Sequence, residues 1–197
     1  MCGIAGFINL KGGQNIEFSG ALEDAAQALN LRGPDLQSTY HPKPGLGFAH
    51  ARLSIIDTSE SANQPMSAYD NRYTIVFNGE IYNYQELKER LEKEKHEVFQ
   101  TVSDTEVILR MFHHYGKACA HAFNGFFAFA IYDKEKNEIF IARDRLGIKP
   151  LLYTQTKDAF FFASEMKALL KFGIQKDLDF VSLQQYFQFN YIPNPAT

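Results

Sequence analysis

Apolar residues recur along this chain at two different spacings. In three stretches they return every three or four residues, which is the spacing of one face of an amphipathic helix. The residues that carry it are Leu22, Ala25, Ala26 and Leu29 in the first stretch, Tyr84, Leu87 and Leu91 in the second, and Val107, Ile108, Met111, Phe112 and Tyr115 in the third. The pattern predicts three helices, and a fourth, short helix is predicted after Ser164.

A polar residue that can cap a helix stands before each of the three stretches. Ser19 is predicted to cap the first helix. Asn83 with Glu86, and Ser103 with Glu106, match the capping box, in which the later acidic side chain bonds back to the first residue. The predicted helices therefore begin at these polar residues.

The segments between the helices are rich in aromatic and β-branched residues, which is typical of strands. These segments are residues 4–9, 46–56, 73–77, 126–133, 138–143, 151–154 and 160–163. Short turns at 134–137 and 155–158 indicate antiparallel hairpins, because parallel strands need longer crossovers. The almost wholly apolar segment 126–133 is expected to be buried on both faces. The predicted fold class is α+β, a layered sandwich of sheets and helices.

The composition is that of an ordinary globular protein: 197 residues, 45% hydrophobic and 22% charged, with a net charge of −3. This length supports one sizeable core. No run of Lys or Arg creates a basic surface, so neither nucleic acid nor an anionic membrane is an expected partner. The apolar start, residues 4–8, is too short for a signal sequence or a membrane span, and a cytoplasmic location is expected.

Cysteines and histidines give no sign of a bridge or a metal site. Cys2 and Cys119 are expected to be free thiols, because nothing in the sequence indicates secretion. The six histidines show no metal-ligand spacing with each other or with cysteine, so no metal is predicted.

The hydrophobic pattern weakens towards the C-terminal end. Leu183, Tyr186 and Phe187 are spaced for a helical turn, and a proline-containing stretch of linker-like composition follows. The sequence therefore predicts one domain over residues 1–180 and the start of a linker over residues 181–197.

Cys2 directly follows Met1, so removal of Met1 would place a thiol and a free α-amine on one residue. A free thiol has a pKa of ~8.5 and an α-amine a pKa of ~7.7–8.0, so at neutral pH the amine is partly unprotonated and can accept the thiol proton. Cys2 is thus a candidate nucleophile that brings its own base. The alternatives are a lipid acceptor, a buried hydrophobe or a chance small residue.

Asn78 and Gly79 stand between apolar residues and form, on their own, a strong hairpin-turn signal. The functional alternative is an oxyanion hole, in which the Asn78 amide and the Gly79 N–H bind the negative oxygen formed when a thiolate attacks an amide. One such donor lowers the barrier by ~2.7–4 kcal/mol. Glycine would also permit a close backbone approach and an unusual φ.

Three charged residues could together bind both ends of a free amino acid. Arg52 lies inside an apolar segment, and a guanidinium binds an α-carboxylate through two parallel hydrogen bonds. Asp104 and Glu80 offer negative charge for an ammonium group. Each has a structural alternative. Arg52 could form a salt bridge or lie at a strand edge, Asp104 could complement the helix dipole, and Glu80 could be a solvated turn residue.

Many short motifs follow one another in a common order along nearly the whole chain. They are residues 1–4, 32–35, 52–57, 64–65, 78–83, 103–106, 127–133, 142–151 and 163–169. Each is weak alone, but in this order and spacing they are specific. The chain resembles the class II glutamine amidotransferases, most nearly the glutaminase domain of glutamine-hydrolysing asparagine synthetases. One departure is Leu31, where these enzymes often have histidine before the Arg-Gly-Pro-Asp turn.

The resemblance implies an N-terminal-nucleophile fold, a four-layer αββα sandwich of two antiparallel sheets. It also implies roles: the nucleophile attacks the side-chain amide of glutamine, an oxyanion hole stabilises the intermediate, and charged groups bind the carboxylate and ammonium of the substrate. The implied catalytic residues are Cys2, Asn78 and Gly79, and the implied substrate-binding residues are Arg52, Leu53, Ile55, Glu80 and Asp104. Four further motif residues, Asp144, Arg145, Lys149 and Glu165, are assigned to the fold and to domain contact.

The resemblance further implies that this domain supplies ammonia to an ATP-dependent asparagine synthetase. The synthetase domain of the same parent chain, with its ATP and Mg²⁺, is expected outside these residues, because no Ser-Gly-Gly-Leu-Asp-Ser-like loop occurs here. No cofactor is implied for this domain, glutamine is its expected ligand, and the family often forms homodimers. Two alternatives stay open: an amidotransferase domain serving an amino-sugar or polysaccharide precursor, and a non-catalytic docking module.

Overall fold

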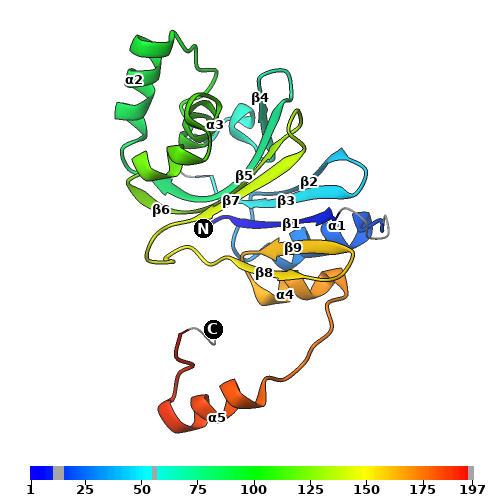
Figure 1. Cartoon of the computed structure of the whole chain (residues 1–197). Helices are drawn as coiled ribbons and strands as arrows, with labels where there is room; N and C mark the ends of the chain where they lie inside the picture. The colour runs from blue at the N-terminus through cyan, green and yellow to red at the C-terminus, as the bar shows by residue number, and fades with distance from the viewer. Residues whose placement is uncertain (11–15, 55–56, 195–197) are drawn as a thin grey trace.

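Two antiparallel sheets lie face to face, with helices on both outer sides, in a computed structural model (Figure 1). The structure describes residues 1–10, 16–54 and 57–194. Helices α2 and α3 cover one sheet, and α1 and α4 cover the other, so the layers run helix, sheet, sheet, helix. The predicted four-layer αββα sandwich is confirmed.

Both sheets are built from antiparallel pairs. The five-stranded sheet has the order β2 (Leu36–Lys43), β3 (Leu46–Arg52), β1 (Gly3–Asn9), β9 (Ala159–Ala163) and β8 (Leu152–Gln155). The four-stranded sheet has the order β4 (Met66–Ala68), β5 (Tyr73–Ile81), β6 (Gly125–Asp133) and β7 (Glu138–Arg143). The predicted hairpins β6–β7 and β8–β9 are confirmed.

Alternating side chains along the strands divide the apolar core into three layers. Along β6, for example, Phe127, Phe129 and Ile131 pack towards α2 and α3, while Ala128 and Ala130 pack between the sheets. The third layer lies between the five-stranded sheet and α1 and α4. β6 is therefore buried on both faces, as its apolar sequence predicts.

The helices occur where the apolar spacing predicts them, but two of the three predicted caps are wrong. The helices are α1 (Ser19–Ala28), α2 (Tyr84–Lys95), α3 (Asp104–Tyr115), α4 (Met166–Leu169) and α5 (Phe180–Phe189), with short 3₁₀ turns at η1 (Glu60–Ala62), η2 (Gly116–Ala122) and η3 (Leu170–Phe172). Ser19 is already inside α1, and its hydroxyl bonds to Glu17. Asn83 precedes α2 without capping it, because its amide bonds to Ala122 and Asn124.

Ser103 does cap α3, accepting a hydrogen bond from the Thr105 N–H at 3.1 Å. The second half of the predicted capping box is absent. The Glu106 carboxylate instead accepts the N–H groups of Gln100 and Thr101 and pairs with Arg110. The start of α3 is therefore fixed by the loop before it as well as by its cap.

Strand β5 runs straight through Asn78 and Gly79, so the hairpin-turn interpretation of this pair is wrong. Pairing with β6 continues without interruption from Tyr73 to Ile81, which outweighs the local turn preference. Two strands were not predicted: β2, whose sequence is largely polar, and β4, which has only three residues. Strand β3 ends at Arg52 rather than continuing as predicted through Ser54; Ile55 and Ile56 lie outside the described residues.

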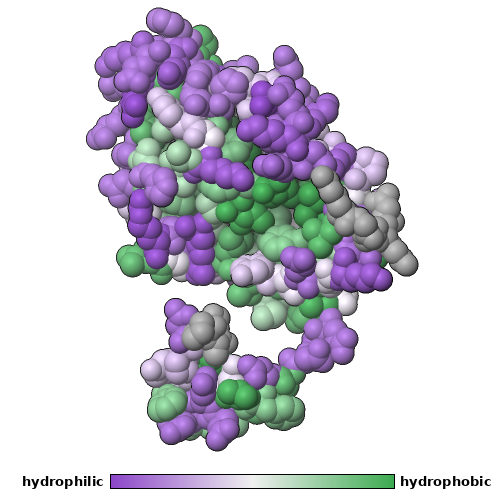
Figure 2. Space-filling model, in the orientation of Figure 1, coloured by the Kyte–Doolittle hydropathy of each residue, from purple (hydrophilic) through white to green (hydrophobic). Residues whose placement is uncertain are grey.

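Helix α5 stands apart from both sheets at the end of an extended segment (Figure 1). It exposes several large apolar side chains, among them Phe180 and Phe187. The outward surface near α2, in contrast, is largely hydrophilic (Figure 2). Among the described residues no helix is long and apolar enough to cross a membrane. The predicted domain boundary at residue 180 stays a prediction.

Candidate active site

The layer between the sheets is apolar over most of its length and becomes polar at one end. Ile4, Phe48 and Val76 belong to the apolar part. On β3, His50 and Arg52 follow Phe48 at intervals of two residues. On β5, Asn78 follows Val76 at the same interval. Because side chains alternate along a strand, these polar groups point to the same side as the apolar ones. The polar end of the layer therefore collects chemically active side chains from both sheets.

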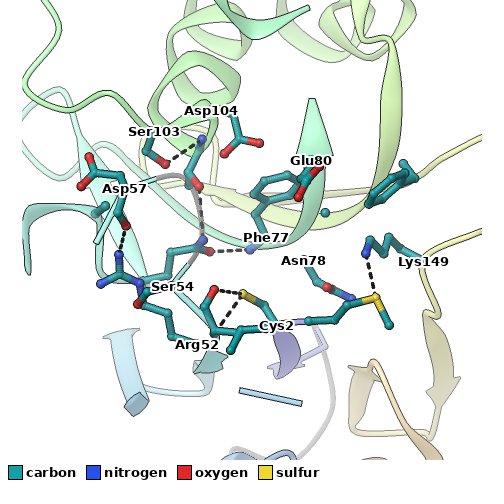
Figure 3. A pocket seen from close by; sticks show the side chains of 17 residues that line it. Cys2, Arg52, Ser54, Asp57, Phe77, Asn78, Glu80, Ser103, Asp104 and Lys149 are labelled. Atoms are coloured by element: carbon teal, nitrogen blue, oxygen red, sulfur yellow. Dashed lines mark hydrogen bonds between the residues drawn. The ribbon is translucent and has the colours of Figure 1, made fainter. Parts of the chain in front are cut away.

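A cavity of about 180 Å³ opens at this polar end. Figure 3 shows the side chains converging on it from the residues before β1, the end of β3, the far part of β5 and the first turn of α3. The predicted site residues that line it are Cys2, Arg52, Leu53, Asn78, Gly79, Glu80 and Asp104. The remaining predicted residue, Ile55, lies outside the described residues. The fold thus brings together residues that are up to 102 positions apart in the sequence, from Cys2 to Asp104.

Cys2 is held at the mouth of this cavity by backbone contacts. The Leu53 N–H lies 3.4 Å from the Cys2 Sγ, and the thiol lies 3.6 Å from the Leu53 carbonyl. Arg32 Nε donates to the Cys2 carbonyl at 2.9 Å. Burial raises the pKa of the Cys2 thiol, although the Leu53 bond and nearby positive charges oppose this. At neutral pH the sulfur is therefore a thiol that needs a base.

While Met1 remains attached, the nitrogen of Cys2 is a peptide amide and cannot serve as that base. The Met1 side chain also lines the cavity, and the Lys149 Nζ lies 3.0 Å from its sulfur. Met1 itself is 58% exposed, so its peptide bond to Cys2 is near the surface.

Asn78 is 1% exposed, yet neither its Nδ2 nor its Oδ1 has a hydrogen-bond partner among the described residues. Leaving a buried amide without partners costs ~1–3 kcal/mol per group. A side chain in this state at the wall of a cavity is arranged for a ligand group that completes its hydrogen bonds.

The Gly79 N–H points towards the same cavity, and the strand register shows why. Gly79 lies opposite Phe127 of β6. The N–H and the carbonyl of Phe127 both point away from β5. The N–H donates to Asp144 Oδ2, and the carbonyl accepts the Asp144 N–H. Directly opposed residues of an antiparallel pair exchange two hydrogen bonds or none. The Gly79 N–H therefore faces away from β6, along the open edge of β5.

Glycine at position 79 is needed for close packing rather than for unusual backbone geometry. A Cβ there would collide with the Phe126 carbonyl oxygen and come within 2.7 Å of the Phe127 Cα. Gly79 is not among the residues with positive φ, so the predicted unusual φ is wrong. Asn78 and Gly79 together present two donors to one region of the cavity.

Arg52 is buried but makes no salt bridge among the described residues. Its Nη1 donates to the Ser59 carbonyl at 3.0 Å and to the Asn63 side chain, and its Nη2 donates to the Asp57 carbonyl. Within the described residues no hydrogen bond uses the Nε–H or the second Nη2 hydrogen, and Nε and Nη2 form one edge of the guanidinium. This edge matches the two oxygens of a carboxylate.

Asp104 and Glu80 provide negative charge in the cavity. The Asp104 Oδ2 accepts the Ile81 N–H at 3.0 Å. Burial, and to a smaller extent the negative charge of Glu80, raise the pKa of Asp104 to about 6, although its backbone hydrogen bonds act in the opposite direction. A bound ammonium group would offset this cost, because an opposite charge favours the carboxylate.

Several residues of the cavity were not predicted. Lys149 was assigned to the fold and to domain contact, but it is buried in the cavity wall, 4.1 Å above the Phe126 ring. Burial lowers the pKa of Lys149. Gln64 and Phe77 also line the cavity. Gln64 lies in one of the matching motifs, so the sequence offered a signal for it, whereas Phe77 reads only as a strand residue.

Two of the other motif residues, Asp144 and Glu165, support the fold. The Asp144 carboxylate accepts the N–H groups of Leu146, Ile148 and Lys149 and so shapes the turn after β7. Glu165 pairs with Arg32 at 3.0 Å. Since Arg32 holds the Cys2 carbonyl, this ion pair reaches the site indirectly.

Comparisons with known proteins agree with this geometry. A family model described as a glutamine amidotransferase domain matches residues 1–197. The chain is 42% identical over 198 residues to asparagine synthetase (glutamine-hydrolyzing) 1 of Bacillus subtilis strain 168, covering 100% of this chain and 31% of that protein. It is 36% identical over 200 residues to asparagine synthetase (glutamine-hydrolyzing) 3 of the same strain, covering 100% of this chain and 32% of the relative.

A similar fold occurs in the glutamine phosphoribosylpyrophosphate amidotransferase from B. subtilis complexed with ADP and GMP, with a TM-score of 0.71 and 23% identity. The match covers 87% of this chain and 44% of that one. This likeness supports the sandwich fold. The chain spans about a third of the length of the curated relatives it matches.

Proposed function

Because this chain belongs to the glutamine amidotransferase domain family, we propose that it hydrolyses the side-chain amide of glutamine to glutamate and ammonia, with Cys2 as the nucleophile. One observation carries the proposal: the Cys2 thiol shares a single cavity with the Arg52 guanidinium, the Asp104 carboxylate and the Asn78 amide, which has no hydrogen-bond partner among the described residues. Glutamine carries one group for each of them.

The first half of the proposed reaction forms a thioester. With Met1 removed, the α-amine of Cys2 accepts the thiol proton as the sulfur attacks the amide carbon of glutamine. The carbonyl electron pair moves onto oxygen, where the Asn78 amide and the Gly79 N–H bind it. The intermediate collapses, the carbon–nitrogen bond breaks, and the α-ammonium returns the proton to the leaving nitrogen. Ammonia departs, and a γ-glutamyl thioester remains on Cys2.

The second half regenerates the thiol. A water molecule gives a proton to the α-amine and attacks the thioester carbon, and the same two donors bind the oxyanion. The carbon–sulfur bond then breaks, the sulfur takes the proton back, and glutamate is released. Arg52 and Asp104 hold the amino-acid end of the substrate throughout, so that the amide carbon stays beside the sulfur.

Incubation of the chain, freed of Met1, with glutamine tests this function. Equal amounts of glutamate and ammonia are expected, with saturation at rising glutamine concentration. Asparagine is one methylene shorter, so its amide cannot reach the sulfur from the same carboxylate and ammonium contacts, and little ammonia is expected from it. Equal rates with both amides, or no ammonia from glutamine, would contradict the proposal.

Glutamine affinity is expected to fall as the pH drops through about 6, because protonation of Asp104 removes the charge that holds the substrate ammonium. The raised pKa of Asp104 in the empty site places this change near pH 6 rather than near 4. Between about pH 6.5 and 5 the dissociation constant should rise about tenfold. Calorimetric titration of the Cys2→Ala variant measures binding without turnover.

The control for this prediction is Asp104→Asn in the same background. Its affinity should be weak and nearly independent of pH over this range, because the amide does not titrate. If Asp104→Asn leaves both the affinity and its pH profile unchanged, Asp104 does not contact the ammonium group.

We also propose that the parent protein is a glutamine-hydrolysing asparagine synthetase, in which the ammonia passes to an ATP-dependent domain outside these residues. Matches to relatives of that name support this, since the chain covers only about a third of their length or less. A homodimer, a cytoplasmic location and the absence of a cofactor in this domain stay predictions. The alternatives, another ammonia acceptor or a non-catalytic module, are not favoured by these relatives.

A further inference from the structure

The Phe77 peptide on β5 is held by two side chains where a neighbouring strand is missing. β4 covers the edge of β5 only as far as Ile75, which lies opposite Met66. At the next edge position, the Phe77 N–H donates to Gln64 Oε1 at 2.6 Å, and the Phe77 carbonyl lies 3.2 Å from His50 Nε2. These two side chains complete the hydrogen bonds that a longer β4 would otherwise have made.

His50 makes its bond across the space between the two sheets. It lies on β3, is 0% exposed, and reaches the backbone of β5 in the opposite sheet. A carbonyl oxygen only accepts, so the Nε2 carries the proton in this bond. Burial lowers the pKa of His50 to about 4, so the ring is neutral at pH 7. Its Nδ1 has no partner in the described part of the chain, which leaves the Phe77 carbonyl as the contact that orients the ring.

Gln64 extends the connection to α3. Its Nε2 donates to Thr105 Oγ1 at 3.2 Å, in the helix turn that carries Asp104. Asp104 in turn accepts the N–H of Ile81. Along the open edge of β5, the positions on either side of Gly79 are therefore both fixed by side chains. The N–H between them is the one that faces the cavity.

We propose that His50 and Gln64 are positioning residues for glutamine hydrolysis, which fix the Phe77 peptide and thereby aim the Asn78 amide and the Gly79 N–H at the oxyanion. This inference rests on the proposed function. His50 acts through β5, on the residue directly before Asn78. Both residues should affect the transition state more than the bound substrate, because among the described residues neither hydrogen-bonds directly to Arg52, Glu80 or Asp104, which hold the amino-acid end.

A matched set of variants tests this in the chain freed of Met1. In His50→Gln the side-chain nitrogen can occupy about the place of Nε2, whereas in His50→Asn it is too short and lies nearer to Nδ1. Gln64→Met keeps the length of Gln64 but lacks the acceptor. His50→Asn and Gln64→Met are expected to lower kcat about 10- to 100-fold, with KM for glutamine changed less than about threefold. His50→Gln should recover most of the lost kcat.

Phe161→Leu is the control for a general loss of core packing. Phe161 lies in the layer between the five-stranded sheet and α1, on the other side from the cavity. The Phe161→Leu substitution should lower the melting temperature and leave kcat unchanged. If His50→Asn does not fold, Gln64→Met decides the matter, because Gln64 lies outside both sheets.

Different outcomes test the positioning role and the proposed glutamine hydrolysis separately. Absence of ammonia release from the unsubstituted chain would overturn the proposed function. An active unsubstituted chain with unchanged kcat in His50→Asn and Gln64→Met would overturn the positioning role alone. A rise in KM that accounts for the whole loss would also overturn it, because the two residues would then serve substrate binding.

Discussion

Replacing Cys2 by alanine should abolish ammonia release from glutamine, by on the order of 10⁴-fold or more. Removing the nucleophile removes the covalent route, and the oxyanion donors alone cannot replace it. The fold should survive, because β1 begins after Cys2 and the thiol makes only long contacts with Leu53. The measurement is the steady-state rate of ammonia release, with the melting temperature recorded for both proteins.

Cys119→Ala is the matched control for this substitution. Cys119 is buried in the core under α3, and burial raises the pKa of its thiol to about 12, so it is an inert hydrophobe at neutral pH. Its replacement should reduce stability by creating a small cavity and leave the rate unchanged. Ammonia release that survives in Cys2→Ala and disappears in Cys119→Ala would show that Cys119 is the nucleophile and would contradict the role of Cys2.

Chains that retain Met1 should be inactive, with less than about 1% of the turnover of processed chains, since general-base assistance alone is typically worth 10²–10⁴-fold. Two effects act together. The Cys2 nitrogen is then an amide without basic character, and the Met1 side chain lies in the cavity against Lys149. Treating one preparation with methionine aminopeptidase for increasing times gives a series of samples, in which intact mass reports the processed fraction and ammonia release reports turnover.

Turnover in this series should rise in proportion to the processed fraction and extrapolate to nearly zero at full retention. The Cys2→Ala variant, processed in parallel, controls for ammonia released by contaminants. A sample whose mass is entirely that of the Met1-containing chain, and which still turns over at the full rate, would show that the α-amine is not the base.

The sequence was most informative where chemistry depends on residue identity. The motifs predict Cys2, Arg52, Asn78 and Asp104, and the fold brings all four to one cavity although Cys2 directly precedes β1 and the others come from β3, β5 and α3. Apolar periodicity likewise predicted the helices and the doubly buried β6, because burial on a given face leaves a repeating pattern in the sequence.

Features that depend on contacts distant in sequence were missed or wrong. The Asn78-Gly79 pair reads locally as a turn, and only pairing with β6 makes it part of a strand. Asn83 is a residue type that often caps helices, but its side-chain amide hydrogen-bonds to Ala122 and Asn124, far along the chain. His50 is a single histidine in an apolar segment, and its contact with Phe77 in the other sheet has no sequence signature.

The most direct test of the central claim, that Cys2 with a free α-amine attacks the amide carbon of glutamine, uses a diazoketone analogue of glutamine. The thiol proton would move to the carbon that bears the diazo group, the Cys2 sulfur would form a thioether with that carbon, and nitrogen gas would leave. Peptide mass spectrometry should find one adduct, on Cys2, only in chains without Met1, and excess glutamine should prevent it. Chains that release ammonia from glutamine while Cys2 stays unmodified at saturating analogue would contradict the account.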